Sequence, residues 1–460
     1  MKNWIIAIAL SLSVVMLGGI VGLNFVKKEE PKNPEEVAEA AVYELKEEYY
    51  QGFPLIEIET QDGQLPFDKE TYINCSFKLS NAGEYNKEVT MKSKYGDKGS
   101  VGIRLRGNST MLADKKPYRL KFKDEISLFG LEANKSWVLL ADYYDMSAIK
   151  NYTAMSFAAK LDGLHFTPTP HHVVVAINGD YKGLFLLCEQ IDENVGRTAV
   201  EEDFDPAVDT DFPFLVEMDQ HALSEGVTGV DNFQIEGFQP FEIKYPEFDD
   251  RGIEEGQQDV VFDYIKEYLT AVLTTLSTGE QVMFRGNSVA FEDLVDVASF
   301  VDYYLVNELT VNSDSNKKSI YMHKTKDGKL QMGPIWDFDI SMSSYGVEST
   351  ESSINIANSL HCFKHSPLMK RFLQKESNYQ LVQQRWDEVK GAVMEVNDEL
   401  KEYKSKLKVV AKYDALRWYG EKGFTVFDFQ YDYVRLFLLD RYAFLDEVLD
   451  KSFAEFNEYM

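Results

Sequence analysis

One stretch decides the interpretation of this chain: Asn307–Ser341, NELTVNSDSNKKSIYMHKTKDGKLQMGPIWDFDIS. An apolar run typical of a helix ends in a polar loop that carries Asp314. Two strands follow, over Ser319–His323 and Leu330–Ile335, and the pair Asp327-Gly328 between them is a strong turn signal. The stretch therefore predicts a helix, an acidic loop and a tight β-hairpin, in that order.

Two further aspartates, Asp337 and Asp339, come directly after the hairpin. Capping a turn is the commonest role of a loop aspartate, and we expect that role for Asp327. Asp337 differs because it follows an apolar strand and lies between aromatic residues, where an unpaired carboxylate is costly, so we expect a cation partner. Asp314 and Asp337 would converge as a phosphoryl-transfer site requires, one orienting the attacking hydroxyl and the other holding a metal. Asp339 could be the metal ligand instead, or a second one.

Composition bounds the class of protein. The chain has 460 residues, 44% hydrophobic and 13% aromatic, which indicates a folded protein of two or three domains. Its 76 acidic and 48 basic residues give a net charge of -28, which excludes broad binding to nucleic acid. An anionic ligand would need a local basic pocket or a metal. The cysteines cannot form a disulfide framework, and we expect Cys75 and Cys188 in the core.

The N-terminus predicts a membrane anchor. Residues 4–26 carry no charge, and about 20 such residues span a bilayer as a helix. A signal peptide is the alternative, but its apolar part is usually about 7–15 residues long, and no clear A-x-A cleavage site follows the apolar run directly. We expect residues 1–28 to anchor the chain, with its bulk outside the cytoplasm, and residues 29–50 to form a charged linker.

The rest of the chain predicts an α+β protein in two lobes. Alternating apolar and polar residues predict antiparallel strands over Phe53–Thr60, Tyr72–Ser80, Val101–Thr110, Pro117–Lys123, His171–Asn178 and Gly183–Ile191. Helices are expected over Asp145–Leu161 and Gln258–Ser277. Another helix should begin after Asp296, which would cap it, and most of the chain beyond residue 355 should be helical. Further strands are expected at Phe214–Met218 and Phe241–Tyr245. The predicted domains are a nucleotide-binding N-lobe sheet over 51–192 and a C-lobe over 193–460 with the catalytic loop, the metal motif and the C-terminal helices.

Four basic residues alternate with apolar ones in two of the predicted strands. Arg104 and Arg106 share one face of the first strand, and Arg119 and Lys121 share one face of the second. If the strands pair, the four cations line one surface beside the Asn108 loop and would suit phosphates. The simpler interpretation is a solvent-facing set of charges, although a basic cluster in so acidic a chain favours a binding role.

The segment GLFLLCEQID resembles the strand-to-linker segment between the two lobes of a kinase. There the backbone binds the adenine edge, so Glu189, Gln190 and Ile191 are candidates for that contact. An ordinary eukaryotic protein kinase is excluded, because the helix over Asp145–Leu161 has no interior glutamate and no G-x-G-x-x-G loop occurs. No H-E-x-x-H or Cys/His spacing predicts zinc, and no G-x-S-x-G or P-loop is present.

Several motifs together resemble one family. They are LRGNST, KKPYRLKF, NGDYKGLFLLCEQID, FLVEMD, FEIKYPE and GPIWDFDIS. The chain from about Pro54 to Leu445 is similar to the CotH (spore coat protein H) family of atypical protein kinases. The resemblance implies a divergent bilobal protein-kinase-like fold, with an antiparallel-sheet N-lobe and a mainly helical C-lobe. It also implies transfer of the γ-phosphoryl of ATP, with Mg²⁺ or Mn²⁺, to serine or threonine of surface, coat or secreted proteins.

The resemblance assigns roles by position. Asp314 takes the catalytic role and Asp337 takes the metal-binding role. In the same kinase interpretation, Lys121 and the three arginines of the basic sheet face would steady the phosphates. The asparagine that binds a second metal in many kinases is replaced by Ser319, a weaker ligand, so the expected metal set is Asp337, Asp339 and Ser319.

Two other functions compete with the kinase. A catalytically inactive kinase-like protein could bind partners in surface or coat assembly. A glycoside hydrolase could also use two carboxylates, but it leaves the basic sheet face unexplained. The acidic surface favours a basic segment in a protein substrate.

Overall fold

The computed structural model describes residues 42–91, 94–223, 231–248, 253–342 and 356–459. The predicted anchor over residues 1–28 and the linker up to residue 41 lie outside these ranges. Within them, no helix combines the length and the apolar character needed to cross a membrane.

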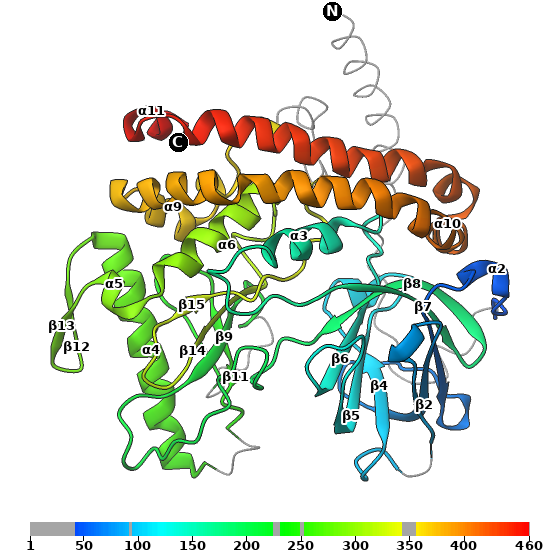
Figure 1. The fold of residues 1–460 in the computed structure, drawn as a ribbon. Coiled ribbons are helices and arrows are strands. Elements are labelled where there is room, and N and C mark those ends of the chain that lie inside the picture. The colour runs from blue at the N-terminus through cyan, green and yellow to red at the C-terminus, as the bar shows by residue number, and fades with distance from the viewer. Residues whose placement is uncertain (1–41, 92–93, 224–230, 249–252, 343–355, 460) are drawn as a thin grey trace, which may run out of the picture.

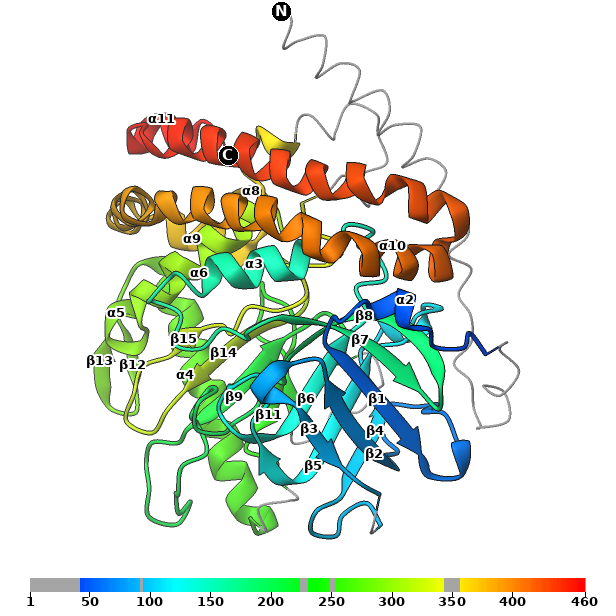
Figure 2. The ribbon, with the colours of Figure 1, turned by 45° about the vertical axis from the view of Figure 1, so that its right-hand side comes forward.

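The N-terminal half forms a closed sheet. Its strands are β1 (Leu55–Thr60), β2 (Ile73–Ser80), β3 (Lys87–Val89), β4 (Val101–Leu105), β5 (Tyr118–Ile126), β6 (Asn134–Leu140), β7 (His171–Ile177) and β8 (Asp180–Glu189). The order is β1-β7-β8-β6-β5-β4-β2, and β1 pairs with β2 as well, so seven strands close on themselves and β3 extends β2 at the side. β1 runs parallel to β7, and the other neighbours are antiparallel. Figure 2 shows the closed arrangement.

The predicted bilobal kinase-like fold is therefore wrong. An open antiparallel sheet leaves two edge strands, whereas here β1 has both edges paired, through Ile58 with Phe77 of β2 and with Ile177 of β7. The parallel contact with β7 joins segments more than 100 residues apart, which alternation within one strand does not reveal. The boundary predicted at residue 192 falls just after β8, and the division into independent domains stays a prediction.

A second, smaller sheet lies beside the first. It contains β9 (Phe214–Met218), β10 (Asn232–Phe233), β11 (Phe241–Tyr245), β14 (Ile320–Lys324) and β15 (Gln331–Met332), in the order β10-β11-β9-β14-β15. The predicted hairpin is confirmed, since Met322 of β14 pairs with Met332 of β15. The predictions for β9 and β11 are confirmed as well. A separate hairpin joins β12 (Val282–Phe284) to β13 (Asn287–Val289).

The helices are α2 (Glu47–Tyr50), α3 (Lys150–Ala158), α4 (Glu255–Thr278), α5 (Phe291–Leu294), α6 (Val297–Thr310), α8 (Cys362–His365), α9 (Pro367–Leu373), α10 (Glu376–Leu449) and α11 (Phe453–Asn457). Helices α10 and α11 lie over one side of both sheets, whereas α4 runs beside the second sheet (Figure 1). The cap predicted at Asp296 is confirmed, because its side chain accepts a hydrogen bond from the Ala298 amide (3.1 Å). α3 is shorter than predicted, since Asp145 holds the turn before it and accepts from the Lys150 amide (2.8 Å).

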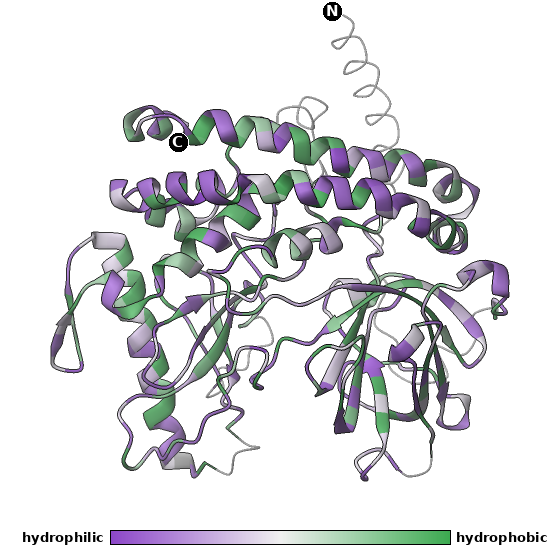
Figure 3. Cartoon of the chain, in the orientation of Figure 1, coloured by the Kyte–Doolittle hydropathy of each residue, from purple (hydrophilic) through white to green (hydrophobic). Residues whose placement is uncertain are grey.

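The helix α10 is folded into two antiparallel arms. Gly420, with φ +68°, interrupts it, and the Tyr431 hydroxyl on the second arm donates to the Leu400 carbonyl on the first (2.7 Å). Hydrophilic and hydrophobic residues alternate along both arms (Figure 3), as expected of helices with one buried face. The arms span the molecule above both sheets (Figures 1 and 2).

Two hydrophobic clusters make the core. One fills the interior of the closed sheet and includes Phe77, Leu120, Phe185 and the predicted core residue Cys75. The other joins the outer faces of β7 and β8, including the predicted Cys188, to the helices and the second sheet. Strands buried on both faces have continuous apolar sequences, which explains the unbroken apolar runs of β7 and β8. This shared core fixes the second sheet and its acidic loop relative to the closed sheet.

Candidate active site

The loop that carries Asp314 is held by the end of α6. Val311 adopts φ +50° and ends the helix. Asn312 then accepts a hydrogen bond from the Asp314 amide (3.0 Å) at Oδ1 and donates from Nδ2 to Asn307 Oδ1 (3.0 Å). These contacts fix the backbone of Asp314 against a buried helix.

The carboxylate of Asp314 is buried, with 1% of the residue exposed. Lys318 Nζ lies 2.9 Å from its Oδ2, yet neither carboxylate oxygen has a partner in hydrogen-bonding geometry. Burial raises the pKa of Asp314, Lys318 opposes the rise, and Asp337 adds to it. A buried carboxylate left in this state is suited to receive a proton or a cation.

The hairpin β14–β15 returns the chain to the same loop. Ser319 precedes it with φ +55° and Asp337 follows it with φ +68°. The Ser319 hydroxyl donates a long hydrogen bond to Asp337 Oδ2 (3.4 Å). The structure thus brings together the predicted residues Ser319 and Asp337. Asp314 is close to them, because the charge of Asp337 raises the pKa of Asp314.

Lys318, which was not among the predicted site residues, lies among the carboxylates. Asp337, Asp314 and Asp339 all raise the pKa of Lys318 against the effect of burial. Its position four residues after Asp314 was the available signal, but the spacing alone does not reveal the other two aspartates. Lys318 is therefore the cation that offsets the three negative charges.

Asp339 is deeper than Asp337, with 5% of the residue exposed. Burial raises its pKa well above the ordinary range, and Asp337 and Asp142 raise it further. Lys150, the first residue of α3, opposes that rise, and its Nζ donates to the Asp339 carbonyl (3.2 Å). Asp142 is affected in the same way, since burial raises its pKa to about 7. The acidic cluster thus extends from the second sheet to the start of α3.

Asn151 connects α3 to the segment between the two hairpin-following aspartates. Its Oδ1 accepts from the Phe338 amide (2.8 Å), and its Nδ2 donates to Asp142 Oδ1 (2.7 Å). Asn151 is buried, so the two bonds form without competition from solvent. This residue was also missed, because the sequence separates it from Phe338 by 187 residues.

Arg106 brings positive charge from the closed sheet. Its guanidinium carbon lies 5.2 Å from the centre of the Trp336 ring, next to Asp337. Desolvation lowers the pKa of Arg106, and Asp337 opposes this effect most strongly. Arg106 and Lys318 are thus two cations whose charges act on Asp337, which agrees with the expected cation partner.

Arg104 and Arg119 lie on the outer face of the closed sheet. β4 and β5 pair as predicted, with Arg104 opposite Arg119. The guanidinium carbon of Arg104 is 4.8 Å from the centre of the Tyr72 ring, and Arg119 Nη2 donates to Ser136 Oγ (3.2 Å). The positive charge of Arg119 lowers the pKa of Arg106, so the two residues are close enough to belong to one basic surface.

Lys121 and Asn108 are both exposed and lie at opposite ends of this surface. Lys121 stands opposite Gly102 in the β4–β5 register, farther along β5 than Arg119. Asn108 accepts a hydrogen bond from Lys69 Nζ (3.3 Å). The preceding Gly107 has φ +82°, and a Cβ there would meet Thr110 Oγ1 at 2.3 Å, so this turn requires glycine.

A family model described as CotH kinase protein matches residues 103–445. The chain belongs to the CotH kinase family. The match includes β4, the Asp314 loop, the hairpin and most of α10, and it confirms the resemblance predicted from the motifs. Membership indicates a kinase-like protein. No curated protein matches the chain.

The predicted adenine linker of this CotH kinase family member is engaged in contacts of its own. Glu189, at the end of β8, is buried and accepts from the Thr169 amide (2.7 Å), and burial raises its pKa. The Gln190 carbonyl accepts from Arg197 Nη1 (2.7 Å), and the Ile191 carbonyl accepts from Gln190 Nε2 (2.9 Å). Each of the two carbonyls therefore already accepts one hydrogen bond within the protein.

The acidic residues fit a divalent cation in chemical type. Across the described ranges no three His, Cys, Asp or Glu residues are gathered closely enough to form a metal centre by themselves. Burial and mutual repulsion raise the pKa of both Asp314 and Asp339, and a cation bound between these carboxylates would oppose that rise. Asp337, Asp339 and Ser319 are the residues that would hold such an ion, with oxygen ligands of the kind that Mg²⁺ prefers.

Proposed function

We propose that this member of the CotH kinase family is an ATP- and Mg²⁺-dependent protein kinase that phosphorylates serine or threonine of surface, coat or secreted proteins. Mn²⁺ would replace Mg²⁺ in the same site. One observation carries the proposal: the buried carboxylate of Asp314 lies 2.9 Å from Lys318, and Asp337 and Asp339 also act on the charge of that lysine. A carboxylate placed in this way can orient a hydroxyl and accept its proton.

The proposed roles follow from position. The substrate hydroxyl oxygen attacks the γ-phosphorus, its proton passes to Asp314, and the bond from that phosphorus to the leaving ADP oxygen breaks. Asp337, with Asp339 or Ser319, would hold a metal that neutralises charge on the phosphates. Arg106, beside Trp336, is the basic residue best placed to bind phosphate oxygens, and its guanidinium offers a planar fork for them.

The outer arginines and Lys121 would act at longer range. Arg104 and Arg119 continue the positive surface away from Arg106, and Lys121 is exposed beyond them. In a chain of net charge -28, such a local surface attracts an anionic nucleotide that the rest of the molecule repels. We therefore propose a steering role for Lys121 and direct phosphate contact for Arg106.

The test is phosphoryl transfer by the purified full chain with labelled ATP, Mg²⁺ or Mn²⁺ and co-expressed proteins, analysed by mass spectrometry. We expect Asp337→Ala to abolish transfer, because the metal would lose its main ligand, while the melting temperature changes little. Asp327→Asn is the matched control, since Asp327 lies in the turn of the same hairpin and is exposed. Transfer by Asp337→Ala at the level of the unmodified protein would refute the assignment.

The second candidate function is that of a catalytically inactive kinase-like protein that binds partner proteins during surface or coat assembly. The carbonyls of Gln190 and Ile191 favour it, because each already accepts a hydrogen bond within the protein and so is less available for the expected adenine contact. Calorimetry separates the two functions: a kinase should bind ATP in a magnesium-dependent way, and a pure binding protein should give no magnesium-dependent heat.

A further inference from the structure

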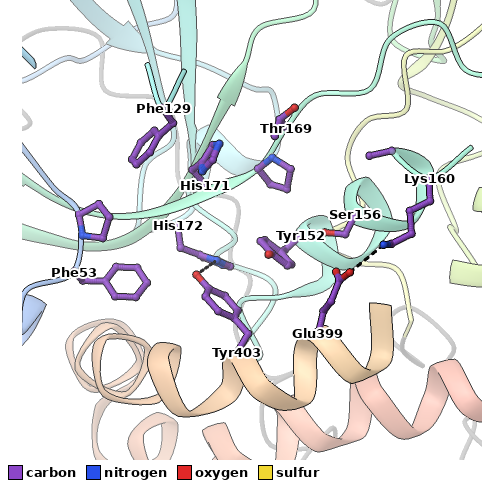
Figure 4. Close-up of a pocket in the computed structure, with 13 residues that line it drawn as sticks. Phe53, Phe129, Tyr152, Ser156, Lys160, Thr169, His171, His172, Glu399 and Tyr403 are labelled. Atoms are coloured by element: carbon purple, nitrogen blue, oxygen red, sulfur yellow. Dashed lines mark hydrogen bonds and ion pairs between the residues drawn. The ribbon is translucent and has the colours of Figure 1, made fainter. Parts of the chain in front are cut away.

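A pocket of about 660 Å³ lies apart from the acidic cluster, between the start of β7, α3 and the first arm of α10 (Figure 4). None of the aspartates discussed above lines it. Its volume is within the range of small-molecule sites, about 300–1,000 Å³. Neither the family match nor the proposed function accounts for it.

Aromatic rings form two walls of this pocket. On one side the ring of Tyr152 packs against those of His172 (ring centres 5.1 Å apart) and Tyr403 (5.3 Å), which are themselves 5.6 Å apart. On the other side Phe129 and His171 are nearly parallel, with centres 4.4 Å apart and planes 7° apart. Figure 4 shows these side chains gathered around the same space. Flat walls of this kind favour a flat aromatic ligand, because stacked or edge-on rings attract one another.

The charged side chains at the pocket are paired. Lys160 Nζ lies 2.9 Å from Glu399 Oε1 and 3.2 Å from Glu395 Oε2, and all three residues are exposed at the rim. A charged ligand would have to displace part of this group to find a partner. The pocket therefore favours an uncharged ligand.

The two histidines present neutral rings. Burial lowers the pKa of both His171 and His172 to about 4. His172 is fully engaged, since Nε2 donates to the Ala148 carbonyl (2.7 Å) and Nδ1 lies 3.1 Å from the Tyr403 hydroxyl. His171 Nε2 is buried and has no hydrogen-bond partner. That atom is out of reach of solvent, so a ligand in the pocket meets both histidines as flat, neutral rings.

We propose that this pocket binds a small uncharged molecule with a planar aromatic ring. The ring lies between the Phe129–His171 wall and the Tyr152–His172–Tyr403 wall. Such a ligand replaces water against five ring systems and leaves the Lys160–Glu399 ion pair intact.

The pocket is connected to the acidic cluster through α3. Tyr152 and Ser156 line the pocket, whereas the first two residues of the same nine-residue helix, Lys150 and Asn151, bond to the Asp339 carbonyl and the Phe338 amide. A ligand that packs on this helix therefore also steadies the segment after the hairpin. Binding itself does not depend on the proposed function, but any effect on phosphoryl transfer rests on it.

Binding is tested on the full chain by ligand-observed NMR, with indole as the probe and cyclohexanol as a non-aromatic control. Ala159 lines the pocket and is exposed, so Ala159→Trp fills the entrance without disturbing the core. We expect Ala159→Trp to weaken indole binding by about tenfold or more. Ala207→Trp, at an exposed alanine in a distant turn, should bind indole as the unmodified protein does. Equal binding of cyclohexanol and indole, unchanged affinity in Ala159→Trp, or no indole binding would each overturn the site.

The connection is tested by amide hydrogen exchange. Saturating indole should slow exchange at the Phe338 amide and along α3 about tenfold in the unmodified protein and not in Ala159→Trp. Binding with unchanged exchange at Phe338 would overturn the connection. Neither measurement uses ATP, so failure here is distinct from failure of the proposed kinase.

Discussion

At the scale of single residues, charge around Asp314 is the property that a kinase would have to control. Three carboxylates act on Lys318, which lies 2.9 Å from Asp314, so this lysine sets how easily Asp314 stays ionised. A general base must be ionised to accept a proton, and a neighbouring cation lowers the pH at which that state forms.

We therefore predict that Lys318→Met slows phosphoryl transfer by about 100-fold and moves the acidic limb of its pH profile to higher pH. The shift has this sign because loss of the cation raises the pKa of Asp314 further above its ordinary value. Rates measured between pH 5 and 9 check it, with Lys318→Arg as the variant that keeps the charge. A slower enzyme with an unmoved acidic limb would assign Lys318 a purely structural role.

The spacing of residues in the sequence predicted part of the candidate site. The remaining residues are close only in the folded structure. Asp314, Ser319 and Asp337 are joined by one hairpin, so local sequence was enough to bring them together. Asn151 and Lys150 reach the same cluster from α3, at sequence separations of 187 and 189 residues. No local pattern encodes such contacts.

At the scale of elements, alternation of apolar and polar residues predicted most strands. It did not predict a strand without such alternation, or how distant strands pair. β9 and β11 were predicted at their observed bounds. β6 was missed, because five consecutive residues at its end, Ser136–Leu140, are buried and the period of two is absent. Closure of the sheet was missed as well, because it depends on the pairing of β1 with β7, between segments far apart in the chain.

The hairpin β14–β15 carries a buried histidine that makes its stability sensitive to acid. His323 Nδ1 donates to the Gly333 carbonyl (3.0 Å), and burial lowers the pKa of His323 to about 4. The unfolded chain binds a proton near pH 6.5, so the native state loses stability as the pH falls from about 6.5 towards 4.

We predict that His323→Gln reduces this dependence by about 2 kcal/mol between pH 7 and pH 5 by linkage, while the buried His171 and His172 keep their own contributions. Denaturant unfolding of both proteins at the two pH values checks it: the unmodified protein should lose more stability on acidification. His221→Gln is the control, because His221 is exposed. An equal loss in His323→Gln and the unmodified protein would show that another group titrates.

At the scale of the whole molecule, α10 ties the helical layer to the acidic loop. Arg441 on its second arm and Glu308 in α6 form an ion pair at 2.9 Å, and both side chains are 0% exposed. Glu308 also accepts from the amides of His361 (2.6 Å) and Phe363 (3.1 Å), so one carboxylate joins α6, α8 and α10 six residues before Asp314. Breaking one partner of a buried pair leaves an uncompensated charge in the core.

We predict that Arg441→Met lowers the free energy of unfolding by about 3–5 kcal/mol, because Glu308 is then buried without its cation. Adding Glu308→Gln should recover part of that loss, since the double variant holds no unpaired charge. Arg435→Met is the matched control on the same arm, where the Asp432 contact is long (3.8 Å) and partly exposed. Denaturant unfolding monitored by circular dichroism measures all four proteins. If the double variant is no more stable than Arg441→Met, the packing of the arginine stem, rather than its charge, holds α10 against the loop.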